Sequence, residues 1–131
     1  MISDFLYHLD SSQRLIIKLT GTACNISCKY CFEKSKNLDF QEFLSPATLH
    51  NSLMQIDCQV GIVLHGGEPL LLGIDSFSKI LSVVRKHRNK IRTVFLMTNG
   101  TLLNQVWIDL LFKEFKDLNI EMLLVLTVLM R

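Results

Sequence analysis

The chain has 131 residues, of which 49% are hydrophobic and 20% charged, with a net charge of +2. This composition is typical of one globular domain and excludes a disordered or collagen-like chain. The small net charge favours neither nucleic acid nor an anionic membrane as a partner. The longest apolar run, 122–130, is about half of the ~20 residues that a membrane-spanning helix needs. The first residues lack the apolar segment of a secretory signal.

Four cysteines are too few for a disulfide scaffold. We therefore expect a cytoplasmic, reducing location, in which clustered cysteines are metal ligands or catalysts rather than disulfides.

Short apolar strands alternate with amphipathic helices along the chain. Helices are predicted to begin at Ser45 and Asp75, each acting as an N-cap, and at Asn104. This alternation predicts an α/β fold with a parallel sheet, right-handed helical crossovers and strands covered on both faces. The predicted strands are the four short runs at 15–19, 60–64, 93–97 and 120–128.

Three cysteines follow the first predicted strand, at the edge of a parallel sheet where ligands bind. Cys24, Cys28 and Cys31 are separated by three residues and then by two, within the loop at 20–33. A compact loop with this spacing can direct three thiolates at one iron–sulfur cluster and leave one iron open to a small molecule. A structural zinc site usually has four protein ligands. Cys58, near the start of the second strand, is expected to be a small buried apolar residue instead.

Two further motifs follow the second and third strands. Residues 65–71 read HGGEPLL and residues 98–103 read TNGTLL. Two consecutive glycines let a backbone approach a ligand closely, and Glu68 adds a carboxylate at the strand end. Taken alone, each motif is an ordinary turn, since Asn-Gly tolerates a positive φ. His65, beside a glycine turn, is typical of a structural hydrogen-bonding residue.

The basic run at 85–92, RKHRNKIR, suggests a nucleic-acid interface at first sight. It falls at the predicted end of a helix, where cations complement the helix dipole. A solvated helix end is therefore the favoured interpretation, and nucleic acid is not expected as a partner.

Together these motifs resemble the signature of the radical S-adenosylmethionine (SAM) superfamily, with an aromatic residue, Tyr30, just before the last cysteine. The resemblance implies that Cys24, Cys28 and Cys31 hold a [4Fe-4S] cluster whose fourth iron is chelated by SAM. In that family, reduction of the cluster cleaves SAM to a 5′-deoxyadenosyl radical that abstracts hydrogen from a substrate. The implied fold is an incomplete (β/α) TIM-like barrel with about three βα units and a fourth strand, so that residues 1–131 form part of the core domain.

The resemblance also assigns SAM contacts but no catalytic residue. The assigned residues all follow predicted strands: Tyr30 near the adenine, Gly66, Gly67 and Glu68 at the ammonium group, and Thr98 and Asn99 beside the ribose and methionine portions.

The phrases CNxxCxYCF, HGGEPLL and TNGTLL are similar in particular to the anaerobic sulfatase-maturating enzymes and peptide maturases of the SPASM-type branch. This likeness implies a protein or peptide substrate and a low-potential electron donor. Two alternatives remain open at this point. The chain could be a non-catalytic iron–sulfur or zinc-binding module, or an inactive remnant of a longer enzyme.

The segment 121–131 departs from the pattern of this branch, in which the fourth strand reads approximately Val-x-Val-Ser-Ile-Asp-Gly-Pro. Here the segment is mostly apolar and lacks the Ser and the Asp-Gly. A shifted reading frame beginning near Glu121 permits Ser-(Ile/Phe)-Asp-Gly-Pro at this place. We therefore expect a frameshift that truncated a longer radical enzyme, with cluster binding retained and turnover absent or very weak.

Overall fold

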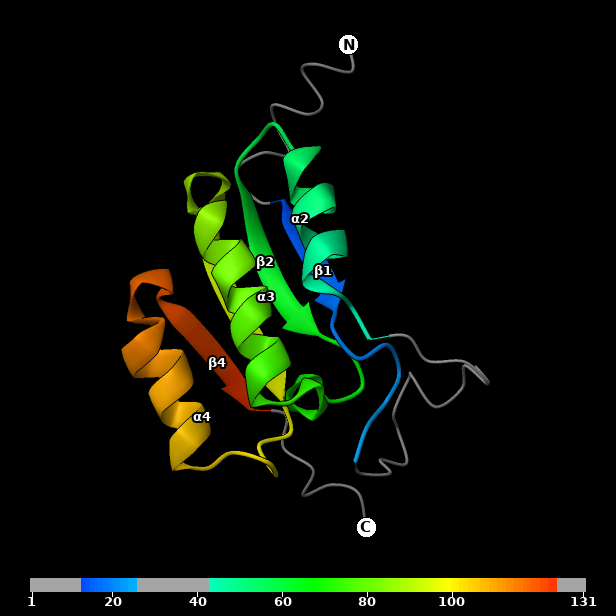
Figure 1. Cartoon of the computed structure of the whole chain (residues 1–131), viewed down its shortest axis with the longest axis vertical. Coiled ribbons are helices and arrows are strands. Elements are labelled where there is room, and N and C mark those ends of the chain that lie inside the picture. Colours follow the sequence, from blue (N-terminus) through cyan, green and yellow to red (C-terminus); the bar gives the residue numbers. More distant parts are fainter. Residues whose placement is uncertain (1–12, 26–42, 125–131) are drawn as a thin grey trace.

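The fold is a four-stranded parallel sheet, seen in a computed structural model that describes residues 13–25 and 43–124. The strands are arranged in chain order, and their arrows point toward the same edge of the sheet (Figure 1). The predicted α/β fold with parallel strands is confirmed, and the sheet is not closed into a barrel. The strands are β1 (Arg14–Lys18), β2 (Val60–His65), β3 (Ile91–Thr98) and β4 (Ile120–Leu124).

Helical segments connect each strand to the next. No helix in the described ranges is long and apolar enough to cross a membrane. The α-helices are α2 (Pro46–Met54), α3 (Ile74–Lys86) and α4 (Gln105–Asp109), the last continued by the π-helical turn η4 (Leu110–Glu114). The short 3₁₀ turns are η2 (Pro69–Leu72), η3 (Arg88–Lys90) and η5 (Lys116–Leu118).

The predicted N-cap at Ser45 and the predicted helix start at Asn104 are confirmed. Ser45 Oγ accepts a hydrogen bond from Thr48 N at 3.1 Å, and Asn104 Oδ1 accepts one from Trp107 N at 3.1 Å. The prediction of Asp75 as a cap was wrong: α3 begins one residue earlier, after Gly73, whose φ is 87°. Asp75 lies in the first turn, where its negative charge still complements the helix dipole.

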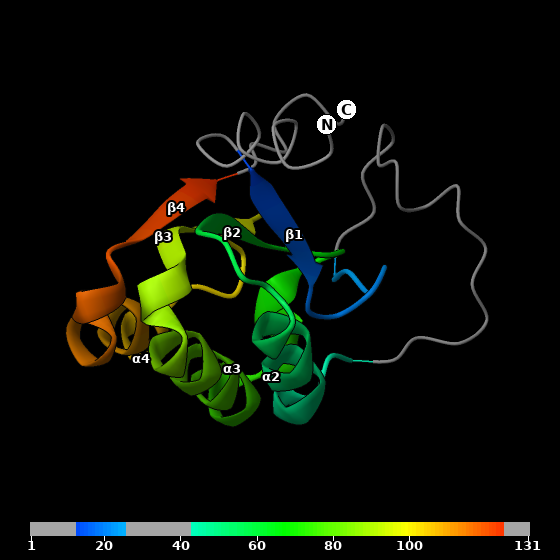
Figure 2. The same cartoon turned by 90° about the horizontal axis from the view of Figure 1, so that it is seen from above.

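The three helices lie on one face of the sheet, where they bury the core (Figure 2). Ile62, Leu64 and Leu96 are completely buried beneath them. The expectation that both faces are covered was wrong for the described residues, since Ile16 is 63% exposed and Leu123 is 49% exposed on the opposite face. In a closed barrel, one face of each strand packs against helices and the other faces the barrel interior, which side chains fill. Strands of this kind are apolar on both faces, so their sequence predicts burial of both faces even when the sheet is open.

The basic run at the end of α3 contacts the rest of the protein through its side chains. Arg85 forms two hydrogen bonds with Asp117, at 2.7 and 3.0 Å, and its guanidinium carbon lies 4.2 Å from the centre of the Phe115 ring. Lys90 Nζ donates to Leu53 O at 3.1 Å. These contacts join the end of α3 to α2 and η5, which agrees with the prediction of a helix end and adds a packing role to it.

The loop after β2 lies directly on the loop after β1. Gly67 N donates to Gly21 O at 2.9 Å, and Glu68 N donates to Ala23 O at 2.7 Å. A Cβ at position 67 would overlap the carbonyl group of Ala23. Gly67 is therefore required for the close approach of two backbone segments, and this contact places the first part of the cysteine loop.

Acid should weaken the contact between α2 and α3, where His87 Nε2 lies 2.9 Å from His50 Nδ1. Burial, together with the charges of His50, Lys90 and Lys86, lowers the pKa of His87 below its usual value. The unfolded chain then binds this proton more readily than the folded chain. The stabilisation is present above about pH 6.5 and is lost as the pH falls through the lowered value. We expect the urea midpoint, followed by circular dichroism, to fall between about pH 7 and pH 5.

The variant His87→Gln should show a much smaller fall of the urea midpoint over the same range. His65→Gln, at the far end of β2, serves as the matched control and should retain the full fall. Equal pH dependence in the His87→Gln variant and the unchanged protein would contradict this assignment.

Replacing Gly67 with Ala should destabilise the protein by about 1–3 kcal/mol, the usual cost of overpacking. It should also speed hydrogen exchange of the Glu68 amide, whose bond to Ala23 O depends on the close approach. Gly73→Ala is the control: its added Cβ would meet nothing within 4 Å, so only its positive φ carries a cost. Unchanged exchange at Glu68 in the Gly67→Ala variant would show that the two loops are not coupled.

Candidate functional site

The carboxyl edge of the sheet carries every predicted site residue that the structure describes. Cys24 follows β1, the pair Gly66 and Gly67 follows β2, and Thr98 ends β3. Because the strands are parallel, these segments meet at one edge. Glu68 and Asn99 lie beside them, whereas Cys28, Tyr30 and Cys31 fall outside the described residues, so convergence of the three thiols stays a prediction.

Glu68 is the buried polar centre of this edge. Its side chain is only 1% exposed. Oε1 accepts hydrogen bonds from Thr98 Oγ1 at 2.6 Å and from Leu70 N at 3.1 Å, and Oε2 accepts one from Asn99 N at 2.8 Å. A buried carboxylate needs such donors to offset its desolvation. Glu68 therefore fastens the loop after β2 to the loop after β3.

Thr20 fastens the third loop, and the sequence reasoning did not identify it. Thr20 is fully buried at the end of β1, and its Oγ1 donates to Glu68 O at 3.1 Å. The same hydroxyl lies 3.4 Å from Ala23 O. A threonine directly after a strand and before a glycine is too common to signal this role. The contact forms because β1 and β2 pair in parallel, which makes the segments that follow them neighbours.

Polar side chains next to Cys24 form a second network. Asn99 Nδ2 lies 3.9 Å from Cys24 Sγ and 3.0 Å from Asn25 Oδ1. Asn25 Nδ2 in turn donates to Thr101 Oγ1 at 2.8 Å. The sequence reasoning placed Asn99 at the site, but Asn25 and Thr101 were missed. The phrases CN and TNGT each contain the residue that meets the other, which could have signalled the contact.

His65 and Cys58 occupy the positions that the sequence reasoning favoured for them outside the cluster. His65 Nδ1 accepts a hydrogen bond from Gly66 N at 2.7 Å, as expected of a structural residue. Cys58 precedes β2 and so lies at the amino edge of the sheet, opposite Cys24. It is half-buried rather than buried, and its thiol donates to Gln13 Oε1 at 3.6 Å.

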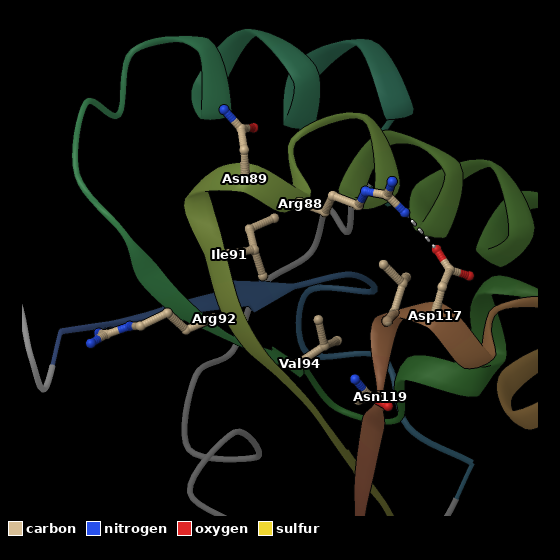
Figure 3. Close-up of a pocket in the computed structure, with 8 residues that line it drawn as sticks. Arg88, Asn89, Ile91, Arg92, Val94, Asp117 and Asn119 are labelled. Carbon is tan, nitrogen blue, oxygen red and sulfur yellow. Dashed lines mark ion pairs between the residues drawn. The ribbon is translucent and has the colours of Figure 1, made fainter.

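A pocket of about 390 Å³ lies at the amino ends of β3 and β4, far from the cysteine edge (Figure 3). Its lining includes Arg88, Arg92 and Asp117. Arg88 is directed at Asp117, 3.5 Å away, whereas Arg92 points away from both. The charged groups of this pocket therefore do not converge on a common point.

Of the three predicted thiolate ligands, the structure describes Cys24 alone. Cys24 is a free, half-buried cysteine. Thiolate is the ligand that iron–sulfur clusters use, and an amide N–H directed at the sulfur suits its negative charge. Residues 13–25 and 43–124 contain no group of three or more metal-ligating side chains.

Known proteins are similar in sequence to most of this chain. The family model described as "Radical SAM superfamily" matches residues 19–125. A cysteine-type anaerobic sulfatase-maturating enzyme of Clostridium perfringens is 30% identical over 103 residues, which is 71% of this chain and 28% of that protein. A serine-type anaerobic sulfatase-maturating enzyme of Klebsiella pneumoniae is 29% identical over 109 residues, 76% of this chain and 27% of that protein. The chain thus spans less than a third of the length of either relative.

Solved structures agree with the sequence comparison. The structure described as native anSMEcpe with bound AdoMet matches with a TM-score of 0.67 and 28% identity, over 86% of this chain and 31% of that chain. The same protein with bound AdoMet and Cp18Cys peptide matches with a TM-score of 0.60 and 29% identity, over 78% of this chain and 29% of that chain. A [4Fe-4S] cluster and SAM (AdoMet) are the cofactors of this family. With the family model covering most of its residues, this chain belongs to the radical SAM superfamily.

Proposed function

We propose that this chain binds a [4Fe-4S] cluster and SAM at the carboxyl edge of its sheet and derives from a maturase that modifies a protein or peptide. The observation that carries the proposal is the buried carboxylate of Glu68, which joins the loop after β2 to the loop after β3. In the same segment, Glu68 O accepts a hydrogen bond from Thr20 Oγ1, and Glu68 N donates one to the carbonyl of Ala23, next to Cys24. Three motifs far apart in the sequence are thereby held as one site.

The roles proposed for individual residues follow from this placement. Cys24 supplies one cluster ligand, with Cys28 and Cys31 as the other two. The bound cluster supplies the electron that cleaves SAM. Gly66 and Gly67 form the backbone surface beside which the SAM ammonium group lies. The remaining proposed SAM contacts are those of Tyr30, Glu68, Thr98 and Asn99.

The hydrogen bonds that Glu68 already accepts limit which of its oxygen atoms can contact SAM. Oε1 already accepts two hydrogen bonds and Oε2 accepts one. Each carboxylate oxygen has about two acceptor sites. The remaining site on Oε2 is therefore the one with which Glu68 meets an ammonium group directly.

The substrate class and partners follow from the relatives. The similar structure with a bound Cp18Cys peptide supports a peptide or protein as the substrate of the parent enzyme. Cleavage of SAM consumes an electron, so a low-potential electron donor completes the set of partners. A reducing, cytoplasmic location keeps the thiols free for iron. Residues 1–131 then constitute part of a radical SAM core domain.

Cluster binding is tested by anaerobic reconstitution with iron and sulfide. Replacing Cys24, Cys28 or Cys31 singly with Ala should reduce the bound iron from about four atoms per chain to background, because each thiolate is one of three ligands. Iron and sulfide analysis with the visible spectrum measures the loss. Cys58→Ala is the matched control and should retain the cluster, since Cys58 lies at the opposite edge of the sheet.

An equal loss of iron in the Cys58→Ala variant would make the fourth cysteine a ligand. One zinc atom per chain, with no iron–sulfur absorbance, would favour a zinc-binding module and contradict the proposal.

SAM cleavage tests the second cofactor. With a strong reductant, the reconstituted chain should form 5′-deoxyadenosine slowly and without dependence on a peptide, because the inner face of its sheet is exposed at Ile16 and Leu123 and admits water. Glu68→Gln should lower the yield by about 5- to 150-fold, since losing a buried hydrogen bond costs about 1–3 kcal/mol. Liquid chromatography of the products measures this.

The control for this comparison is Asp75→Asn, an exposed change in the first turn of α3 that should leave the yield unchanged. Efficient turnover of a peptide by the purified chain would contradict the expectation of an uncoupled reaction. Absence of 5′-deoxyadenosine from a fully loaded protein would contradict SAM cleavage itself.

A further inference from the structure

We propose that Asn99 is a positioning residue whose side-chain amide donates a hydrogen bond to Cys24 Sγ and thereby raises the reduction potential of the bound cluster. This inference rests on the proposed function and deepens it. It assigns to the TNG segment a role toward the cluster, whereas the family resemblance assigns it to the ribose and methionine portions of SAM.

The orientation of the Asn99 amide is set by its neighbours. Its oxygen, Oδ1, accepts from Thr101 N at 3.0 Å and from Thr101 Oγ1 at 2.7 Å. Two donors at this position require the oxygen there, because an amide nitrogen cannot accept a hydrogen bond. The NH₂ group of Asn99 must therefore face the cysteine loop, where Cys24 Sγ lies 3.9 Å away.

Both hydrogens of this NH₂ group have acceptors in the cysteine loop. One is directed at Asn25 Oδ1, at 3.0 Å, and the other at Cys24 Sγ. The Asn25 side chain is itself fixed, because its own Nδ2 donates to Thr101 Oγ1 at 2.8 Å. The three polar side chains thus form a closed ring of hydrogen bonds beside one cysteine. In this arrangement both donors of the Asn99 side chain have acceptors within the protein.

The backbone of Asn99 is anchored as firmly as its side chain. Asn99 N donates to the buried carboxylate of Glu68 at 2.8 Å. Gly100 N donates to Thr98 Oγ1 at 3.1 Å, which holds the turn after β3. Because hydrogen bonds fix both the backbone and the side chain of Asn99, directing its amide at a sulfur atom costs little further conformational entropy.

A hydrogen bond to a ligand sulfur stabilises the reduced cluster more than the oxidised cluster, since the reduced form carries one more negative charge. Hydrogen bonding to the sulfurs is one of the factors that set the potential of iron–sulfur clusters. Removing the amide should therefore make the potential more negative. A residue with only a packing role would change cluster retention but not the potential of the clusters that remain.

The experiment is a redox titration of the anaerobically reconstituted chain without SAM, followed by electron paramagnetic resonance. Asn99→Leu keeps the approximate volume but lacks the amide, and we expect its midpoint potential to shift to a more negative value. Thr101→Val keeps the backbone donor to Asn99 Oδ1 but loses the hydroxyl, so a smaller shift in the same direction is expected. Asn51→Leu, at an exposed position in α2, is the matched control and should leave the potential unchanged.

An unchanged potential in the Asn99→Leu variant would overturn the inference while leaving the proposed function intact. If this variant retains no cluster, Thr101→Val decides in its place, and an unchanged potential there has the same consequence. Absence of a cluster from the unchanged chain would instead overturn the proposed function, and the inference with it.

Discussion

The burial of one carboxylate, that of Glu68, determines the arrangement of the carboxyl edge. A charged group that is 1% exposed is stable only when donors surround it, and here they come from two loops, at Leu70, Thr98 and Asn99. Removing one partner would leave a buried charge under-satisfied, which is among the more destabilising changes known in proteins. The loops cannot separate without breaking these bonds, so the edge behaves as one unit rather than as three flexible turns.

The parallel sheet makes this arrangement possible, and the helices make the sheet stable. The core of the described residues lies between the sheet and the helices α2, α3 and α4, which pack against one face of the strands. Polar groups from the loops after β1, β2 and β3 gather at the carboxyl ends of these strands. The basic residues at the end of α3 act at the opposite edge, where Arg85 and Lys90 attach the helix to its neighbours.

Much of this fold could be predicted because local patterns determined it. Ser45 and Asn104 act as caps through side-chain oxygens next to their helices, and such contacts need no knowledge of the rest of the chain. The misplaced start of α3 has a local cause too. Gly73 adopts a positive φ that an aspartate cap does not need, and the strong Asp75 signal concealed it. The coverage of both sheet faces was overestimated because apolar strands look alike whether their second face meets a helix or the inside of a barrel.

The candidate site was only partly predictable, because its contacts join residues that are distant in sequence. The pairing of Thr20 with Glu68 spans 48 residues, and that of Asn25 with Thr101 spans 76. A motif identifies which residues are unusual but not which of them touch. The double glycine illustrates the difference: the sequence suggests a backbone that approaches a ligand, whereas Gly67 is occupied by the backbone of Ala23. The absence of a side chain at Gly67 thus permits the contact between the two loops. Any ligand bound there meets a surface that Gly67 has already helped to build.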